Sequence, residues 1–505
     1  MEILRESNLQ ILNMIGPNIM DNSKKHRLMK YLLIEDIDNG KAIHNELTRS
    51  FVWIPNIQWD NIFNDDRSIG YIDYLWSNYF LVNDDFDELD VQEQLKNNFA
   101  PRYDDPTYLT SGNINGYTIF TTMGCNARCN YCYEKGRKVS VMNKETANKV
   151  GDYIVKTGKK DGTLIELRWF GGEPLVNENA IDIICQKVKD AGFNYCSDFT
   201  SNGFLFNRDK IEKYVNLWHI KSAQITLDGT EETYNKIKNY KNVKGKNPYR
   251  IVIDNIKMLA FELNVSISIR INISFDNVEN IKELIKEIYQ EFGIHPNINP
   301  YAYPVFDTDN PRTDEENDIL FGKLKDIQDI MRQYGYCQGI WRNDFISPTH
   351  CMCDIGSAVV IGTQGDIGLC EHYSDDNFWG HVDKPEMRDE EMIKSFKEHV
   401  TGQKVCFDCP ILPSCLIPYK CVDLRHCNMW KREWRVREAH YDVIRMYLDI
   451  KNNMQNQFNN QCNLQYNDQN NQCNCKDIEQ DNFEEPERKG FNKLIHYLAI
   501  YFGFK

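Results

Sequence analysis

Three cysteines lie close together in the first third of the chain. Cys125, Cys129 and Cys132 follow the spacing C-x-x-x-C-x-x-C, directly after an apolar run at 117–120 that is typical of a β-strand. Thiolates this close together on one loop need a soft metal centre to hold them. A [4Fe–4S] cluster bound by three thiolates keeps one iron open to a further ligand. The triplet therefore predicts a cluster that takes part in chemistry.

The alternative for the same residues is a zinc site. Zinc prefers four ligands, commonly arranged as two C-x-x-C pairs. A single triplet that follows a strand fits this pattern poorly, so we favour an iron–sulfur cluster.

Composition and charge fit a soluble protein of several domains. The chain has 505 residues, of which 41% are apolar and 26% charged, and its net charge is −15. We find no apolar run of about 18 residues and no apolar signal core at the N-terminus, and the negative charge disfavours a nucleic-acid surface. We therefore expect a cytoplasmic protein without nucleic acid or membrane contact. In that compartment the 17 cysteines favour metal binding over disulfides.

Strand and helix patterns alternate from residue 117 onward. Alternation of this kind predicts parallel strands in a partial (β/α)6 barrel, with ligands gathered at the carboxyl ends of the strands. The expected strands are 117–122, 164–170, 198–201, 223–227, 265–274 and 297–305. The expected helices are 144–157, 178–191, 208–217, 249–262, 278–292 and 315–334.

The cysteine triplet, with the aromatic Tyr131 before its last member, closely resembles the signature of the radical S-adenosylmethionine (SAM) superfamily. The resemblance implies a partial (β/α)6 radical SAM barrel in which Cys125, Cys129 and Cys132 hold a [4Fe–4S] cluster. In that family the open iron chelates SAM, and an electron from the cluster releases a 5′-deoxyadenosyl radical.

Polar residues at further strand ends also follow the family pattern. Gly171 and Gly172 allow the backbone to approach a ligand closely. Glu173 offers a carboxylate to the SAM amino group. Arg270 faces the predicted barrel interior and needs an anionic partner, for which the SAM carboxylate is a candidate. Each of these polar residues is also explained as a turn or cap. The resemblance places these residues around SAM: Tyr131, Gly171, Gly172, Glu173, Ser201, Asn202, Asp228, Arg270 and Asn272.

A second block of cysteines lies between residues 351 and 427. Its spacing resembles the SPASM domain, which binds two auxiliary iron–sulfur clusters in peptide-modifying radical SAM enzymes, and a zinc ribbon would leave four of these cysteines unused. By the resemblance, the first cluster takes Cys353, Cys370 and Cys421, to which we add Cys351 as the fourth ligand. The second cluster takes Cys406, Cys409, Cys415 and Cys427. Five residues separate Cys415 from Cys421 where the family has three, and this departure leaves the ligands of the first auxiliary cluster open.

Glu371 directly follows Cys370. An acidic residue at this place is a catalytic base in the sulfatase-maturing relatives, so the resemblance makes Glu371 a candidate base. The alternative is a surface glutamate without a catalytic role.

The remaining segments complete the domain plan. We expect residues 1–110 to form an α+β module with a hairpin near residue 39. Residues 40–54 resemble the leader-peptide recognition modules of peptide-modifying enzymes. The alternative is a plain N-terminal extension that packs on the barrel. By the resemblance, we expect residues 111–335 to form the radical SAM barrel and residues 336–450 to form the SPASM domain. The Asn- and Gln-rich residues 451–480 are expected to be a disordered linker before a C-terminal helix at 481–505.

These features together predict a radical SAM maturase that acts on a ribosomally made precursor peptide. The resemblance implies an external electron donor such as flavodoxin or ferredoxin and, as the first choice of product, a thioether cross-link. One alternative is a sulfatase-type maturase that makes formylglycine. The other is a non-catalytic metal-binding scaffold.

Overall fold

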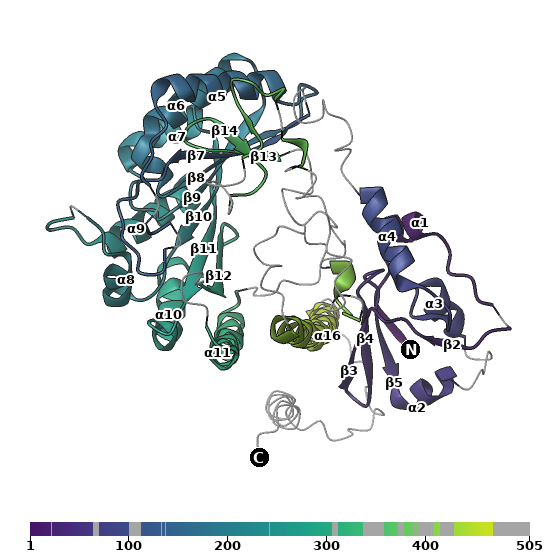
Figure 1. Cartoon of the computed structure of the whole chain (residues 1–505). Helices are drawn as coiled ribbons and strands as arrows, with labels where there is room; N and C mark the ends of the chain where they lie inside the picture. The colour runs from purple at the N-terminus through teal and green to yellow at the C-terminus, as the bar shows by residue number, and fades with distance from the viewer. Residues whose placement is uncertain are drawn as a thin grey trace. The chain divides into compact units, whose positions relative to one another are not determined.

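Figure 1 shows a computed structural model of the chain. Contacts divide it into two units, Met1–Tyr447 and Leu448–Lys505, and the candidate site lies in the first. The structure describes residues 1–21, 23–63, 70–99, 113–132, 134–136, 138–241, 243–305, 312–336, 358–371, 378–387, 389–391, 393, 406, 408–414 and 429–467.

The N-terminal residues form a small α+β module. Its main sheet has the strand order β1-β5-β4-β3, and β2 pairs with β6. The predicted hairpin is confirmed, because β3 and β4 pair antiparallel around Asp38 and Asn39, which have φ values of 50° and 57°. The elements are β1 (Glu2–Arg5), α1 (Leu9–Ile15), β2 (His26–Leu28), β3 (Leu32–Ile37), β4 (Gly40–Asn45), β5 (Phe51–Pro55), α2 (Asn56–Trp59), η1 (Asp60–Phe63), α3 (Ile72–Ser77), β6 (Leu81–Asn83) and α4 (Glu88–Phe99).

Six parallel strands in sequence order make up most of the larger sheet, from β12 at one edge to β7, as the alternating pattern predicts. They are β7 (Gly116–Thr122), β8 (Ile165–Gly171), β9 (Tyr195–Ser201), β10 (Ile220–Thr226), β11 (Ser266–Ile273) and β12 (Ile298–Pro304). The helical segments between and after them are α5 (Lys144–Thr157), η2 (Pro174–Asn177), α6 (Glu178–Asp190), η3 (Arg208–Lys210), α7 (Ile211–Asn216), α8 (Glu231–Lys238), α9 (Pro248–Lys257), η4 (Met258–Glu262), η5 (Val278–Asn280), α10 (Ile281–Phe292) and α11 (Asp314–Gln333). The chain thus has an α/β fold with a parallel sheet.

The two faces of this sheet differ in polarity. On β8, Leu167 and Trp169 are buried in the core that the strands share with the helices, whereas Glu166 and Arg168 are only half-buried. Figure 1 shows the helices along one side of the strands. Because side chains alternate along a strand, the face away from the helices carries the polar residues.

The sheet continues beyond β7 with strands from the cysteine-rich part of the chain. β13 (Ala358–Ile361) pairs parallel with β7, and β14 (Asp366–Gly368) and β15 (Gly380–His381) follow antiparallel. Gly365 makes the turn before β14 with a φ of +93°, which favours glycine. The sequence pattern did not predict this extension of the sheet.

The long helix α16 (Met429–Asn467) corrects one expectation. Its first half is held by tertiary contacts, since Arg445 and Tyr441 both bond Asp329 of α11. A helix that has begun adds residues at little cost, so α16 runs on into the segment that we expected to be a disordered linker. The rest of that linker and the expected C-terminal helix lie outside the described residues. Among the helices that the structure describes, none is long and apolar enough to cross a membrane.

Candidate active site

The cysteine triplet lies on the loop after the carboxyl end of β7. The loop that follows β8 runs directly beside it, since Gly172 N–H donates to Thr122 O at 3.0 Å and Glu173 N–H to Gly124 O at 2.9 Å. A Cβ on Gly172 would lie 2.5 Å from Gly124 O, and one on Gly171, at a φ of +136°, would lie 2.1 Å from Thr122 O. Glycine is therefore required at both positions because the backbone of the cysteine loop lies where a Cβ atom would be.

Glu173 is fully buried and joins two strand ends. Its carboxylate accepts hydrogen bonds from Ser201 Oγ at 2.9 and 3.1 Å, from Asn202 N–H at 2.8 Å and from Leu175 N–H at 3.2 Å. Burial raises the pKa of Glu173 to about 7, and the two N–H donors oppose the rise. The contact of this carboxylate with the SAM amino group stays a prediction.

Asn202 connects the end of β9 to the cysteine loop. Its Nδ2 donates to Asn126 Oδ1 at 2.7 Å and lies 3.8 Å from Cys125 Sγ, which also accepts Ala127 N–H at 3.3 Å. Asn126 Nδ2 is a buried donor that has no hydrogen-bond partner among the described residues. N–H groups aimed at cysteine sulfur favour the thiolate that a cluster needs.

These residues fit a [4Fe–4S] cluster by the chemistry of their donor set. Cys125, Cys129 and Cys132 are free, half-buried thiols on one loop, with the unpaired Nδ2 of Asn126 beside them. Within the described ranges, no group of three or more Cys, His, Asp or Glu side chains, the triplet included, is arranged to hold a metal ion, so the fit rests on the types and spacing of these thiols. Burial raises the pKa of Cys125 to about 11, so iron must displace a proton from this thiol when it binds.

Four of the predicted SAM residues form one hydrogen-bonded network behind the loop, in which Asp228 and Asn272 are buried. Tyr131 OH donates to Asp228 Oδ2 at 2.5 Å and accepts from Asn272 Nδ2 at 3.2 Å. Asn272 also donates its backbone N–H and Nδ2 to Asp228 Oδ1, at 3.0 and 3.1 Å, and accepts Arg270 Nε–H at 2.8 Å. The structure thus brings together residues from β11, the end of β10 and the cysteine loop.

Sequence reasoning missed the fifth member of this network, Lys238 at the end of α8. Its Nζ lies 2.7 Å from Asp228 Oδ2. The backbone beside it is tied to the cysteine loop, because Arg128 N–H donates to Lys238 O at 2.8 Å and Lys241 N–H to Asn126 O at 2.9 Å. The signal in the sequence was spacing: Lys238 lies four residues after the buried Tyr234, on the same helix face.

The predicted auxiliary-cluster ligands are described only in part. Cys370 is half-buried against the core of the larger sheet, whereas Cys406 and Cys409 pack against the core of the N-terminal module. Glu371, the predicted base, is half-buried directly after Cys370. Five of the predicted ligands lie outside the described residues: Cys351, Cys353, Cys415, Cys421 and Cys427.

The N-terminal module contacts the segment that carries the C-x-x-C pair. Glu46 is fully buried, with His44 Nδ1 at 2.8 Å and Arg49 Nη1 at 3.2 Å, and it accepts a hydrogen bond from Ser414 Oγ. Leu412 belongs to the buried core of the module. The module therefore helps to hold the residues that follow Cys409.

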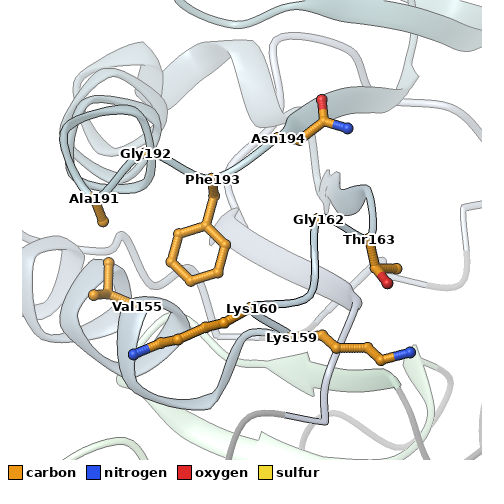
Figure 2. Close-up of a pocket in the computed structure, with 9 residues that line it drawn as sticks. All are labelled: Val155, Lys159, Lys160, Gly162, Thr163, Ala191, Gly192, Phe193 and Asn194. Carbon is orange, nitrogen blue, oxygen red and sulfur yellow. The ribbon is translucent and has the colours of Figure 1, made fainter.

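A pocket of about 310 Å³ lies at the other edge of the sheet. Its lining residues precede β8 and β9, at the amino ends of these strands, and Figure 2 shows the ring of Phe193 among them. Parallel strands end at the opposite edge, where the cysteine loop lies, so this pocket is separate from the candidate active site.

Comparison with known proteins agrees with this geometry. Residues 119–288 match the radical SAM superfamily. The chain is 22% identical to the radical SAM cyclopropyl synthase TigE of Paramaledivibacter caminithermalis over 413 residues, which cover 74% of this chain and 78% of TigE. It is 24% identical to an uncharacterized protein of Methanocaldococcus jannaschii over 258 residues, which cover 49% of this chain and 82% of that protein.

A solved structure adds evidence for the fold. Native anSMEcpe with bound AdoMet (SAM) and Cp18Cys peptide matches 67% of this chain and 99% of its own, with a TM-score of 0.50 and 13% identity. At this identity the match shows a shared fold alone. The chain therefore carries a radical SAM domain over residues 119–288, the catalytic domain of a superfamily of enzymes that use a [4Fe–4S] cluster and SAM.

Proposed function

We propose that the protein is a radical SAM enzyme that modifies a ribosomally made precursor peptide. The observation that carries the proposal is the attachment of the cysteine loop to neighbouring strand ends. Gly172 and Glu173 bond its backbone, and Asn202 bonds Asn126 next to Cys125. A triplet of thiols fixed at the carboxyl edge of a parallel sheet matches the place where such folds bind ligands.

The residues of the chain have distinct tasks in this proposal. Cys125, Cys129 and Cys132 hold the cluster, while Asn202 Nδ2 and the Ala127 backbone offer N–H groups to the sulfur of Cys125. When bound, the cluster supplies the electron that cleaves SAM to a 5′-deoxyadenosyl radical, and an external donor such as flavodoxin or ferredoxin restores that electron. Gly171 and Gly172 let the backbone after β8 pack directly against the cysteine loop, which holds the triplet at the sheet edge.

A peptide substrate is supported by the polar face of the sheet and by the fold relative. Half-buried polar groups line the face away from the helices, among them Arg168, Asp198 and Gln224. Such groups can pair with the amides and side chains of an extended peptide. The structure of anSMEcpe also holds a peptide together with AdoMet.

The product that we propose first is a thioether cross-link between a peptide cysteine and a carbon atom. Two four-iron auxiliary clusters, with Cys370, Cys406 and Cys409 among their ligands, would bind the substrate thiolate or accept the remaining electron. The name of TigE, a cyclopropyl synthase, adds carbon–carbon ring formation as a second candidate. Glu371 supports a third candidate, oxidation of a peptide residue to formylglycine.

Anaerobic reconstitution tests the enzyme itself. We expect about twelve irons per chain from three four-iron clusters, and release of 5′-deoxyadenosine from SAM with dithionite. Cys129→Ala should abolish that release, whereas Cys185→Ala, at a buried cysteine of the core, should keep it. Protein that binds zinc and never cleaves SAM would point to the metal-binding scaffold instead.

Mass spectrometry of a co-expressed peptide separates the products. A thioether lowers the peptide mass by two hydrogens per cross-link and blocks one cysteine thiol. A new carbon–carbon bond has the same mass change but leaves the thiols reactive. An aldehyde at a cysteine or serine would contradict cross-linking and support formylglycine formation.

A further inference from the structure

Lys238 is a charged residue that is only 2% exposed. Its ammonium group has three N–H bonds and meets three acceptors: Asp228 Oδ2 at 2.7 Å, Tyr131 OH at 2.9 Å and Thr226 Oγ1 at 2.6 Å. Every donor is therefore used within the protein. Lys238 differs in this respect from a residue that waits for a ligand.

One partner of Lys238 lies between two cluster cysteines. Tyr131 is, with Asn130, one of the two residues that separate Cys129 from Cys132, and its ring centre is 5.5 Å from Lys238 Nζ. Burial opposes the charge of Lys238, but Asp228, Tyr131 and the Cys129 thiol together raise its pKa well above the ordinary value. The ammonium is thus charged and within electrostatic reach of the cysteine loop.

Burial of this ion pair calls for a reason beyond stability. A buried ion pair adds little folding stability compared with a well-packed apolar pair, because the cost of removing both charges from water offsets their attraction. A positive charge beside an iron–sulfur cluster favours the reduced form, which carries one more electron, and a negative charge favours the oxidised form. Lys238 and Asp228 are in a position to exert these opposite effects.

We propose that Lys238 is a positioning residue of the cluster loop and that, with Asp228, it sets the reduction potential of the cluster held by Cys125, Cys129 and Cys132. The inference rests on the proposed function, since it needs that cluster. Reduction adds one electron from an external low-potential donor. Lys238 donates no proton in this step, and its hydrogen bond fixes Tyr131 and with it the backbone of Cys132.

Redox titration of the reconstituted full-length protein tests this. The variants are Lys238→Met, Asp228→Asn and the double variant, with Lys236→Met as the control because Lys236 lies exposed on the same helix. Electron paramagnetic resonance of the reduced protein gives the potential, and the signal that is absent in Cys129→Ala identifies the triplet cluster.

Opposite shifts are the expected result. Lys238→Met should lower the ratio of reduced to oxidised cluster about tenfold at a fixed potential, a 59 mV shift for a one-electron couple. Asp228→Asn should shift the potential in the positive direction. The double variant and Lys236→Met should stay near the wild type.

A purely structural clamp predicts a different outcome. Both single variants would then shift the potential in the same direction, or leave it unchanged while they lose iron, and either result overturns the inference. If Lys238→Met does not fold, Asp228→Asn and the double variant still decide by the same criteria. If the proposed function is wrong, the reconstituted wild-type protein will hold no triplet cluster, and this result is distinct from the two above.

Discussion

Asn202 donates its backbone N–H to the carboxylate of Glu173 at 2.8 Å, and this bond joins the loops that follow two neighbouring strands. Ser201 supports the same carboxylate from the end of β9. Because Glu173 also donates its own N–H to Gly124 O, one residue connects three strand ends around the cysteine loop.

Glu173→Gln should destabilise the protein by about 1–3 kcal/mol, since the amide NH₂ would face buried donors and leave one of them unpaired. Urea unfolding at pH 8 measures the loss. Glu212→Gln is the matched control, because Glu212 is exposed on α7 and should give no change. Equal unfolding midpoints for the two variants would contradict the central place of this carboxylate.

The same carboxylate predicts a pH dependence. Burial raises the pKa of Glu173 from 4.5 to about 7, so the folded protein holds this proton more tightly than the unfolded chain does. The stability that the folded protein gains from this tighter proton binding is full below pH 4.5 and is lost as the pH rises through about 7. The stability difference between wild type and Glu173→Gln should therefore be larger at pH 5.5 than at pH 8.5, as urea unfolding at both values will show. A constant difference would refute the shift.

Gly172→Ala should displace the cysteine loop. The new methyl group would lie 2.5 Å from Gly124 O and 2.6 Å from Met123 O, which are backbone atoms that cannot turn aside. We expect a loss of about 1–3 kcal/mol of stability and less iron at the triplet. Gly322→Ala is the control, because its Cβ meets nothing within 4 Å on a helix and should stabilise the protein slightly. Iron content and thermal unfolding of both variants test this prediction, and equal values for the two variants would contradict it.

Glu46→Gln should loosen the N-terminal module. The substitution removes the buried carboxylate charge that faces Arg49 at 3.2 Å, and breaking a buried ion pair from one side costs about 3–5 kcal/mol. Hydrogen exchange of residues 1–99 should rise, while exchange in β8 to β12 stays the same. Unchanged protection of the module would show that the charge of Glu46 does not hold it.

Cys406→Ala with Cys409→Ala tests the auxiliary clusters. We expect iron to fall by about four per chain, the content of one cluster, while dithionite-dependent cleavage of SAM remains. Cys196→Ala, at a buried cysteine of the larger sheet, should keep all the iron. Iron content equal to the wild type would remove this pair from the ligand set.

The sequence predicts the parallel strands of the larger sheet because buried apolar residues recur at alternate positions along them, as Ile165, Leu167 and Trp169 do on β8. It also predicts which residues gather, since the carboxyl ends of parallel strands share one edge. The pairing of β13 with β7 was missed because its partner lies far away in the sequence, and no local pattern records that distance.

The site shows the same limit. Cys125, Cys129 and Cys132 are recognised by their spacing alone. Lys238 is not, because a lysine at a helix end is usually solvated, and only the fold reveals that Asp228 and Tyr131 surround it. The sequence singles out Glu173 as a candidate, but the strand ends that it joins could be seen only in three dimensions.

The parallel pairing of β13 with β7 has a consequence for biosynthesis. A ribosome delivers β7 and the cysteine loop long before residues 358–361, so the outer edge of β7 stays unpaired for much of translation. A chain that stops before β13 keeps the edge open, and exposed edges of this kind pair with other chains. Premature termination should therefore yield aggregates rather than a working shorter enzyme.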